Sequence, residues 1–343
     1  MNNTTDFAQF GETRFTGLLD VAIDLTRLNE PGYWVVIGSF EGDWLLLKFK
    51  DKSNAAKDFT GTWQGVDIDA WKSSMSKVQY QEAVLALKEH IALGDVYQAN
   101  ICRVLKAEIK ETGYDITGLV SLLNTNNPAP YGGVVSVNKT SHQRLTKDIA
   151  IASASPELFL KRNGEHISSS PIKGTGRTSA DLTEKDRAEN VMIVDLVRND
   201  LSQICQTGSV KVPILLEEQL HPGLVHLVST VQGVLNKQVS WKDIFQATFP
   251  PGSVSGAPKI SALKLIKELE TVNRGPYCGA IGWINTNDDT AEIAVGIRTF
   301  WKDNKHLLFG TGAGITWGSE AEAEWDETEL KCAKLFEIAA NHL

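Results

Sequence analysis

Segments with strand-like and helix-like patterns follow one another in mixed order along this chain. Apolar and β-branched runs that favour strands occupy residues 33–38, 44–49, 134–137, 149–153, 158–161, 166–168, 279–284, 291–299 and 307–310. Helical spacing of apolar residues follows Ser76 and recurs over residues 182–204, 259–269 and 319–342. Because a parallel sheet needs a regular alternation of strand and helix, this order predicts an α+β fold with large, mostly antiparallel sheets.

The character of the sequence changes near residue 76. Before it, the chain is rich in tryptophan and glycine, and residues 42–43 have the composition of a hairpin turn between two strand-like runs. The 343 residues, of which 42% are hydrophobic and 22% charged, can form one large domain or two modest ones. We therefore divide the chain into an N-terminal segment, residues 1–75, that packs on the core, and a main domain, residues 76–343.

Charge and composition disfavour several classes of partner. The formal net charge of −8 argues against a broad nucleic-acid surface. No apolar run approaches the roughly 20 residues that cross a bilayer, so we expect no membrane association. The first residues have neither a basic nor an apolar section of a secretory signal. The four cysteines are scattered without a C-x-x-C pair, which predicts a reducing, cytoplasmic location.

Two acidic pairs lie at helical spacing. Asp186 and Glu189 are three residues apart, as are Glu324 and Glu327, so each pair shares a helix face, and Lys331 follows four residues after Glu327. Four carboxylates that faced one another would repel unless a hard cation lay between them, and Mg²⁺ suits that role. Spacing alone is more typical of two solvated helix faces with one supporting ion pair, so by itself it is a weak signal.

Lys173 lies in a glycine-, serine- and threonine-rich loop at residues 171–181. Its neighbours are apolar residues, proline and glycine, so its amine can be partly removed from water. Desolvation lowers the pKa of a lysine and makes the amine a nucleophile. The alternative is an ordinary loop lysine that points into solvent.

The glycine-rich run 310–314 resembles a phosphate-binding loop but lacks the spacing of either common nucleotide motif. A nucleotide site is therefore disfavoured, although backbone N–H groups there could hold a carboxylate.

Other polar residues are ambiguous when taken singly. Arg298 interrupts an apolar strand-like run and needs an anionic partner, either an ion pair or a ligand. Glu157, at the start of a strand-like run, is either an acid whose pKa is adjusted for proton transfer or a carboxylate that belongs to a turn. His226 is more often a structural histidine than a catalytic one. Gln98 and Tyr277 carry no signal on their own.

Taken together, these residues lie in segments that resemble the chorismate-utilising enzymes, which include anthranilate, aminodeoxychorismate, isochorismate and salicylate synthases. The resemblance runs from about Ser76 to the last residue, through segments 94–103, 153–160, 171–177, 189–201, 226–233, 249–262, 279–283, 294–299 and 310–331. It implies that residues 76–343 are a chorismate-binding catalytic domain with its active site between large sheets and their flanking helices. It also implies a reduced N-terminal part, which leaves open whether a regulatory tryptophan binds.

Two positions indicate the branch of this family. Members that add water carry a lysine where this chain has Gln98, and glutamine has no titratable amine. Anthranilate synthases typically read P-I-A-G-T where this chain reads P-I-K-G-T with Lys173. The resemblance therefore implies aminodeoxychorismate synthase component I, with anthranilate synthase component I as the alternative. A non-catalytic chorismate-binding homologue is disfavoured because each expected metal and substrate position is filled.

The resemblance also implies roles for the polar residues. Glu189 and Glu327 would bind Mg²⁺ directly, and Asp186 and Glu324 would hold its waters. Residues that would contact the substrate are Tyr277, Arg298, Gly312, Gly314, Lys331, Gln98 and His226.

For the reaction itself, the resemblance implies that Lys173 attacks C2 of chorismate while the C4 hydroxyl leaves. Glu157 would be the general acid, Thr175 would help to position the reacting groups, and His226 would support them more weakly. Ammonia would come from a separate glutamine amidotransferase subunit and replace the lysine. The product would be 4-amino-4-deoxychorismate, a precursor of para-aminobenzoate and folate.

Overall fold

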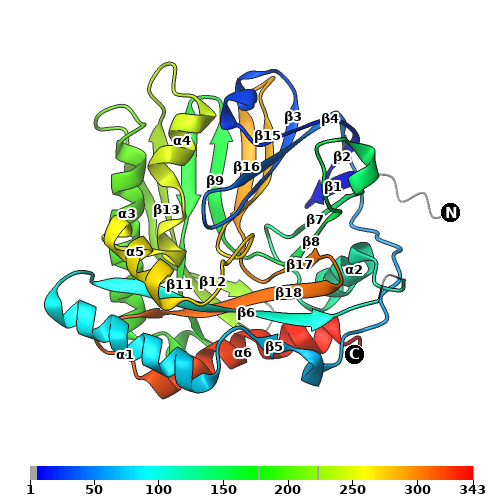
Figure 1. Ribbon diagram of the computed structural model, residues 1–343. Coiled ribbons are helices and arrows are strands. Elements are labelled where there is room, and N and C mark those ends of the chain that lie inside the picture. Colours follow the sequence, from blue (N-terminus) through cyan, green and yellow to red (C-terminus); the bar gives the residue numbers. More distant parts are fainter. Residues whose placement is uncertain (1–5, 111, 177, 222–223, 343) are drawn as a thin grey trace.

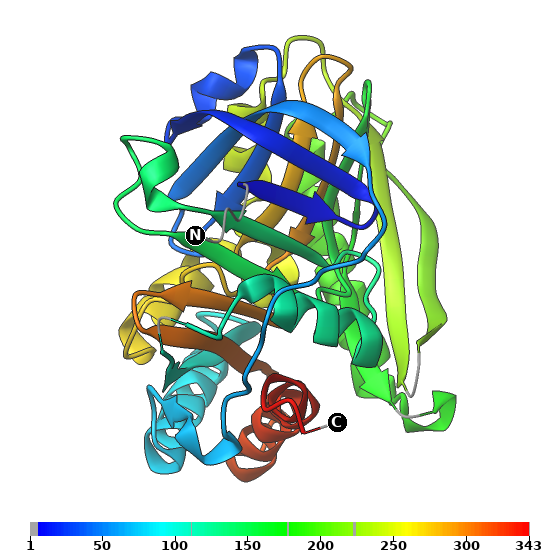
Figure 2. The ribbon, with the colours of Figure 1, turned by 90° about the vertical axis from the view of Figure 1, so that its right-hand side faces the viewer.

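The strands of the computed structural model form one continuous series of antiparallel pairs, described for residues 6–110, 112–176, 178–221 and 224–342 (Figures 1 and 2). In order of pairing, the series runs β12 (Lys211–His221), β13 (Leu224–Val234), β10 (His166–Ser170), β9 (Leu158–Asn163), β16 (Thr290–Val295), β15 (Ala280–Asn285), β3 (Tyr33–Gly38), β4 (Trp44–Asn54), β2 (Thr13–Ala22), β1 (Phe7–Phe10), β7 (Gly133–Val137), β8 (Ile149–Ser153), β17 (Thr299–Asp303), β18 (His306–Ile315) and β6 (Gln98–Glu108). Three short strands join its ends: β11 (Ile172–Gly176) pairs with β13, and β5 (Lys72–Ser73) and β14 (Gly256–Ala257) pair with β6. The predicted α+β fold with large antiparallel sheets is confirmed.

Helices pack against this series of strands. They are α1 (Lys77–Leu93), α2 (Ile116–Asn126), α3 (Glu184–Ser202), α4 (Trp241–Thr248), α5 (Lys259–Leu269) and α6 (Ala321–Ala339), together with the 3₁₀ turn η5 (Gly252–Val254). Helices α1 and α6 lie side by side under β6 and β18, whereas α3 packs on β13 and β11 (Figure 1). None of the helices in the described part of the chain is long and apolar enough to cross a membrane.

Local sequence signals set the helix ends. Ser76 and Gln79 form a capping box at the start of α1, and Gly94 ends that helix in the left-handed conformation. Thr183 and Asp186 form a second capping box at the start of α3. The start of α3 is therefore held by the same Asp186 that the sequence assigned to a metal site.

Two predicted segments differ from the structure. The loop predicted at residues 171–181 contains strand β11, because Ile172 and Gly176 pair with residues of β13, a strand that was not predicted. The strand predicted over residues 291–299 is broken near Arg298, whose φ of 50° is left-handed. Strands β16 and β17 on either side of this break pair with different neighbours, so the chain turns there from one part of the series to another.

The first 75 residues add strands to the same series. Strand β3 pairs along its length with β15, and β1 pairs with β7, while the predicted hairpin turn at residues 42–43 connects β3 to β4. Buried side chains of β3 and β4, such as Trp34 and Phe49, belong to the large core that continues under β15 and β16. The division of the chain at residue 75 stays a prediction.

Candidate active site

Lys173 lies where the two ends of the strand series meet. Its strand β11 is irregular in its pairing with β13 between Ile172 and Thr175, and Gly174 within this bulge has a φ of +85°. Bulges redirect a side chain out of the regular alternation of a strand. The side chain of Lys173 crosses to β18, where a Cβ built on Gly314 would lie 2.9 Å from its Nζ.

The amine of Lys173 is surrounded by opposing charges. Burial lowers the pKa of this amine below its ordinary value. The Glu189 carboxylate acts in the opposite direction, and the Lys331 ammonium lowers the pKa further. The partial burial of Lys173 and the position of its Nζ beside Gly314 argue against an ordinary loop lysine that points into solvent.

Two buried amide side chains lie beside Lys173, and three of their polar atoms have no hydrogen-bond partner among the described residues. Gln98 is fully buried at the start of β6, and the same hypothetical Cβ on Gly314 would lie 2.6 Å from its Nε2 and 3.2 Å from Asn100 Oδ1. Neither end of the Gln98 amide, nor Asn100 Oδ1, has a hydrogen-bond partner among the described residues. Buried polar atoms are normally paired, so these atoms indicate that a polar ligand completes the site.

Glu157, immediately before β9, is almost completely buried at 3% exposure. Burial raises the pKa of its carboxyl to about 7, although hydrogen bonds from the Ser253 hydroxyl and the Ile172 backbone N–H, and the charge of Lys173, act against the rise. A carboxyl with a pKa near neutrality can donate a proton at physiological pH. Because Ile172 is the neighbour of Lys173, an acid and an amine meet at one place.

Arg298 and Tyr277 border the same region. Burial lowers the pKa of Arg298, and the charge of Glu157 opposes this change. The guanidinium of Arg298 makes no hydrogen bond or ion pair with the residues that the structure describes. Such a buried cation suits an anionic ligand. Tyr277 is buried against Gly310, where an added Cβ would lie 2.0 Å from the ring.

The backbone of β18 presents amide groups to the site. On the partner strand β6, the N–H of Asn100 donates to Ser255 and that of Cys102 donates to Glu270, so both point away from β18. In an antiparallel pair, the residues opposite them must also direct their backbone groups outward. These opposite residues are Gly314 and Gly312, and the carbonyl of Gly312 accepts a hydrogen bond from Lys331 Nζ at 3.0 Å.

Carboxylates from α3 and α6 converge on lysines. Lys185 Nζ lies 3.7 Å from Glu189 Oε1 and 3.8 Å from Glu324 Oε1, so one cation bridges the two helices. Glu327 and Lys331 form an ion pair of 2.6 Å on α6. Burial raises the pKa of Glu324, and the neighbouring Glu327 charge adds to the rise. Of the four predicted carboxylates, Glu189 of α3 and Glu324 of α6 therefore approach the same cation, and the predicted metal site stays a prediction.

These carboxylates fit a hard divalent cation in their chemistry. In the described ranges, no three His, Cys, Asp or Glu side chains converge as a ready-made metal site. Mg²⁺, however, commonly takes only one or two protein carboxylates and completes its shell with waters and substrate oxygens. Glu189 and Glu324 already share a cationic group, the ammonium of the half-exposed Lys185.

The other residues predicted for the site, Asp186, His226 and Thr175, lie at its edge. The carboxylate Oδ2 of Asp186 accepts hydrogen bonds from Thr183 N and Oγ1 at 2.8 and 2.7 Å, so the helix cap uses this oxygen. His226 is buried on β13 directly opposite Thr175. The side chain of Thr175 lies outside the described part of the structure, and its predicted role stays a prediction.

Comparison with known proteins places this site in a family. Residues 46–337 match the family described as chorismate binding enzyme. The chain belongs to this family. Two solved structures share the fold of this chorismate binding enzyme: anthranilate synthase component I from Streptococcus pneumoniae (TM-score 0.77, 23% identity, 97% of this chain and 90% of that one) and the menaquinone-specific isochorismate synthase from Escherichia coli (TM-score 0.77, 16% identity, 98% and 88%).

Curated relatives within the chorismate binding enzyme family carry two different names at similar identity. Aminodeoxychorismate synthase component 1 of Escherichia coli (strain K12) is 36% identical over 272 residues, which are 75% of this chain and 57% of that protein. Anthranilate synthase component 1 of Aquifex aeolicus (strain VF5) is 33% identical over 281 residues, which are 78% of this chain and 54% of that protein. The match thus spans little more than half the length of either relative, and it does not choose between them.

Three residues of this chorismate binding enzyme site were missed in the sequence. Asn100 lies two residues after Gln98 and therefore on the same face of β6, a spacing that could have identified it. Ser253, in a turn, bonds to Glu157, and Lys185 bridges α3 and α6. No sequence spacing predicts the contacts of Ser253 and Lys185, because each joins segments that are far apart in the chain.

Proposed function

We propose that this protein is an enzyme that replaces the C4 hydroxyl of chorismate with an amino group, the activity of aminodeoxychorismate synthase component I. The observation that carries the proposal is the partly desolvated amine of Lys173 beside the unpartnered amide of Gln98 and the unpartnered amide oxygen of Asn100. A lysine in this state suits covalent catalysis, and Gln98 has no proton-accepting amine to activate water.

The reaction divides between the groups of the site. The neutral Nζ atom of Lys173 forms a bond to C2, both double bonds of the ring diene shift by one position, and the C4–O bond breaks as Glu157 gives its proton to the departing oxygen. Ammonia then bonds to C4, and the electron pair of the C2–N bond returns to Lys173. Arg298, Lys331, Tyr277 and the amides of Gly312 and Gly314 hold the two carboxylates of the substrate.

Mg²⁺ is part of this proposal. Glu189 and Glu327 would bind it, and Glu324 and Asp186 would hold its waters. When bound, it would supply positive charge that draws electrons from the ring carboxylate and the diene. Ammonia would come from a glutamine amidotransferase partner, and the product would enter para-aminobenzoate and folate synthesis.

Product identification tests the proposal. The protein is incubated with chorismate, a magnesium salt and an ammonium salt, and the products are identified by mass. We expect 4-amino-4-deoxychorismate with its enolpyruvyl group retained. Anthranilate and pyruvate as the main products would instead assign the chain to the anthranilate synthases, which its relatives support at similar identity. Unchanged chorismate would contradict both.

The lack of room for a side chain at Gly314 gives a testable prediction. In Gly314→Ala, the new methyl group would lie 2.6 Å from Gln98 Nε2 and 2.9 Å from Lys173 Nζ, so it must displace them. We expect chorismate consumption to fall by about a hundredfold, because displacement of about 1 Å at a reacting group has that effect. Gly318→Ala is the matched control, since nothing lies within 4 Å of a Cβ there. Equal rates of chorismate consumption in Gly314→Ala and Gly318→Ala would show that the reaction does not take place beside Gly314.

Glu327 gives a prediction about the metal. In Glu327→Gln we expect the magnesium concentration for half-maximal activity to rise by at least about tenfold, because even indirect loss of support for a bound metal has that effect. Magnesium titration of chorismate consumption measures it. The exposed Glu337, also on α6, supplies the control Glu337→Gln. An unchanged titration of Glu327→Gln would show that Glu327 is not a ligand.

A further inference from the structure

Glu157 lines a small cavity. This cavity is lined by residues of β9, β10, β16, α3, α4 and η5 and by Pro171, which precedes β11, and its volume is about 20 Å³. A cavity of about 10–15 Å³ already holds one water molecule if polar groups line it. Its walls include apolar side chains such as Phe159 and Val197, together with the hydroxyl-bearing residues Ser169, Thr248 and Ser253.

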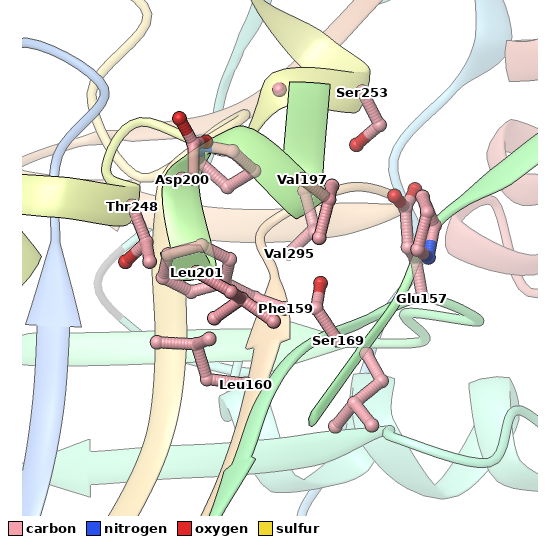
Figure 3. Close-up of a pocket in the computed structure, with 14 residues that line it drawn as sticks. Glu157, Phe159, Leu160, Ser169, Val197, Asp200, Leu201, Thr248, Ser253 and Val295 are labelled. Atoms are coloured by element: carbon pink, nitrogen blue, oxygen red, sulfur yellow. The ribbon is translucent and has the colours of Figure 1, made fainter. Parts of the chain in front are cut away.

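A second carboxyl lines the cavity opposite Glu157. Figure 3 shows Asp200 and Glu157 on opposite sides, with Val197 and Val295 between them and Ser169 lower in this view. Asp200 is buried on α3, and its Oδ2 lies 2.6 Å from Lys259 Nζ. That ammonium also donates to the carbonyl of Thr248 at 3.0 Å, and the Lys259 side chain is 14% exposed. The Asp200 end of the cavity therefore lies next to an ion pair whose lysine retains a small exposure to solvent.

The pKa values of these two carboxyls are close enough for proton exchange. Burial raises the pKa of Asp200 to about 6, although the Lys259 charge acts against the rise. The pKa of Glu157 is raised to about 7, as described above. A proton passes readily between groups of similar pKa when water or a hydroxyl lies between them.

The proposed reaction requires a proton to return to Glu157 after each turnover, as the count of hydrogen atoms shows. This inference rests on the proposed function. Glu157 gives one proton to the oxygen that leaves C4 as water. Ammonia arrives neutral with three hydrogens, and the product leaves with all three as an ammonium group. Lys173 returns to a neutral amine. One proton per turnover must therefore come from solvent to the Glu157 carboxylate, which is 3% exposed and has substrate on its open side.

We propose that Asp200 returns this proton to Glu157 through water held in the cavity between them. Asp200 takes a proton at its own end of the cavity, where Lys259 lies, and passes it along the water and the hydroxyls of Ser169 and Ser253. Asp200 does not touch the substrate, so it is a positioning and relay residue for the proton and not a catalytic one.

Rapid-quench kinetics tests the proposal. In Asp200→Asn, Glu157 still starts protonated, so the first turnover should proceed within about twofold of wild type, whereas later turnovers should slow by at least about tenfold because the proton returns slowly. The expected record is a burst of one product per enzyme followed by a slow steady state. Asp195→Asn, at an exposed carboxylate on the same helix, should behave as wild type.

Other outcomes overturn the proposal. A steady state equal to wild type would mean that the proton reaches Glu157 from the substrate side. Equal slowing of the first and later turnovers would assign Asp200 a structural role. Because Asp200→Asn leaves the Lys259 ammonium unpaired, the double variant Asp200→Asn/Lys259→Met is measured as well, and it should give the same burst. If wild-type protein forms no aminated product, the proposed function fails, and that result is distinct from either outcome in the variants.

Discussion

Lys173→Ala is expected to lower the amination of chorismate by at least about a thousandfold, or about 4 kcal/mol of transition-state stabilisation. The variant lacks the amine that divides one difficult substitution into two allylic ones. At high ammonium concentration we expect partial recovery, because ammonia can then attack C4 directly. The rate of product formation at several ammonium concentrations measures both effects.

Intact-protein mass gives a second measurement for Lys173. With chorismate and no ammonia, wild-type protein should gain the mass of chorismate less one water, since the Nζ–C2 bond forms as water leaves. Lys173→Ala should gain nothing. The matched control is Lys161→Ala, at an exposed lysine on β9, which should form the adduct and react as wild type. A Lys173→Ala variant as active as wild type at low ammonium would remove the lysine from the mechanism.

Much of the architecture could be predicted from local patterns, and the failures have physical causes. Strand β3 and helix α5 agree with the predicted bounds because apolar periodicity and a turn or proline mark their ends. Strand β6 was missed because it is buried on both faces and yet carries Gln98, Asn100 and Arg103. Arg103 is buried there by its hydrogen bonds to Thr328 and its position over the Trp325 ring, contacts from α6 that no local pattern predicts.

The residue types of the candidate site could be predicted from the sequence, but their arrangement in space could not. Helical spacing indicated that Glu324 and Glu327 share a face, and the structure places their helix against α3 through Lys185. The environment of Lys173 depends on a bulge in β11 and on the approach of β18 from the opposite end of the strand series. Such contacts join segments more than 100 residues apart in the sequence. Local patterns do not encode these contacts. The resemblance to a family identified the site residues but not the contacts between them.

Glu157→Gln is expected to lower the rate of amination by about 10²–10⁴-fold, the usual contribution of a general acid. The pH dependence should change as well. In wild-type protein the rate rises with pH as Lys173 loses its proton and falls as Glu157, with its pKa raised to about 7, loses its own. Glutamine has no proton to lose, so the decline above about pH 7 should disappear. The control is Glu165→Gln, at an exposed glutamate in the turn after β9.

Thermodynamic stability provides an independent measure of the same carboxyl. The pKa of Glu157 is about 7 in the folded protein, above the value of 4.5 for an unperturbed side chain. The folded state therefore binds more protons than the unfolded state between these values, and the free energy of unfolding must fall as pH rises through that range. In Glu157→Gln this part of the decline should be absent when denaturant unfolding is compared at pH 5 and pH 8. If both proteins lose the same stability, Glu157 is not the buried acid that titrates near neutrality, and the assignment of the proton donor is wrong.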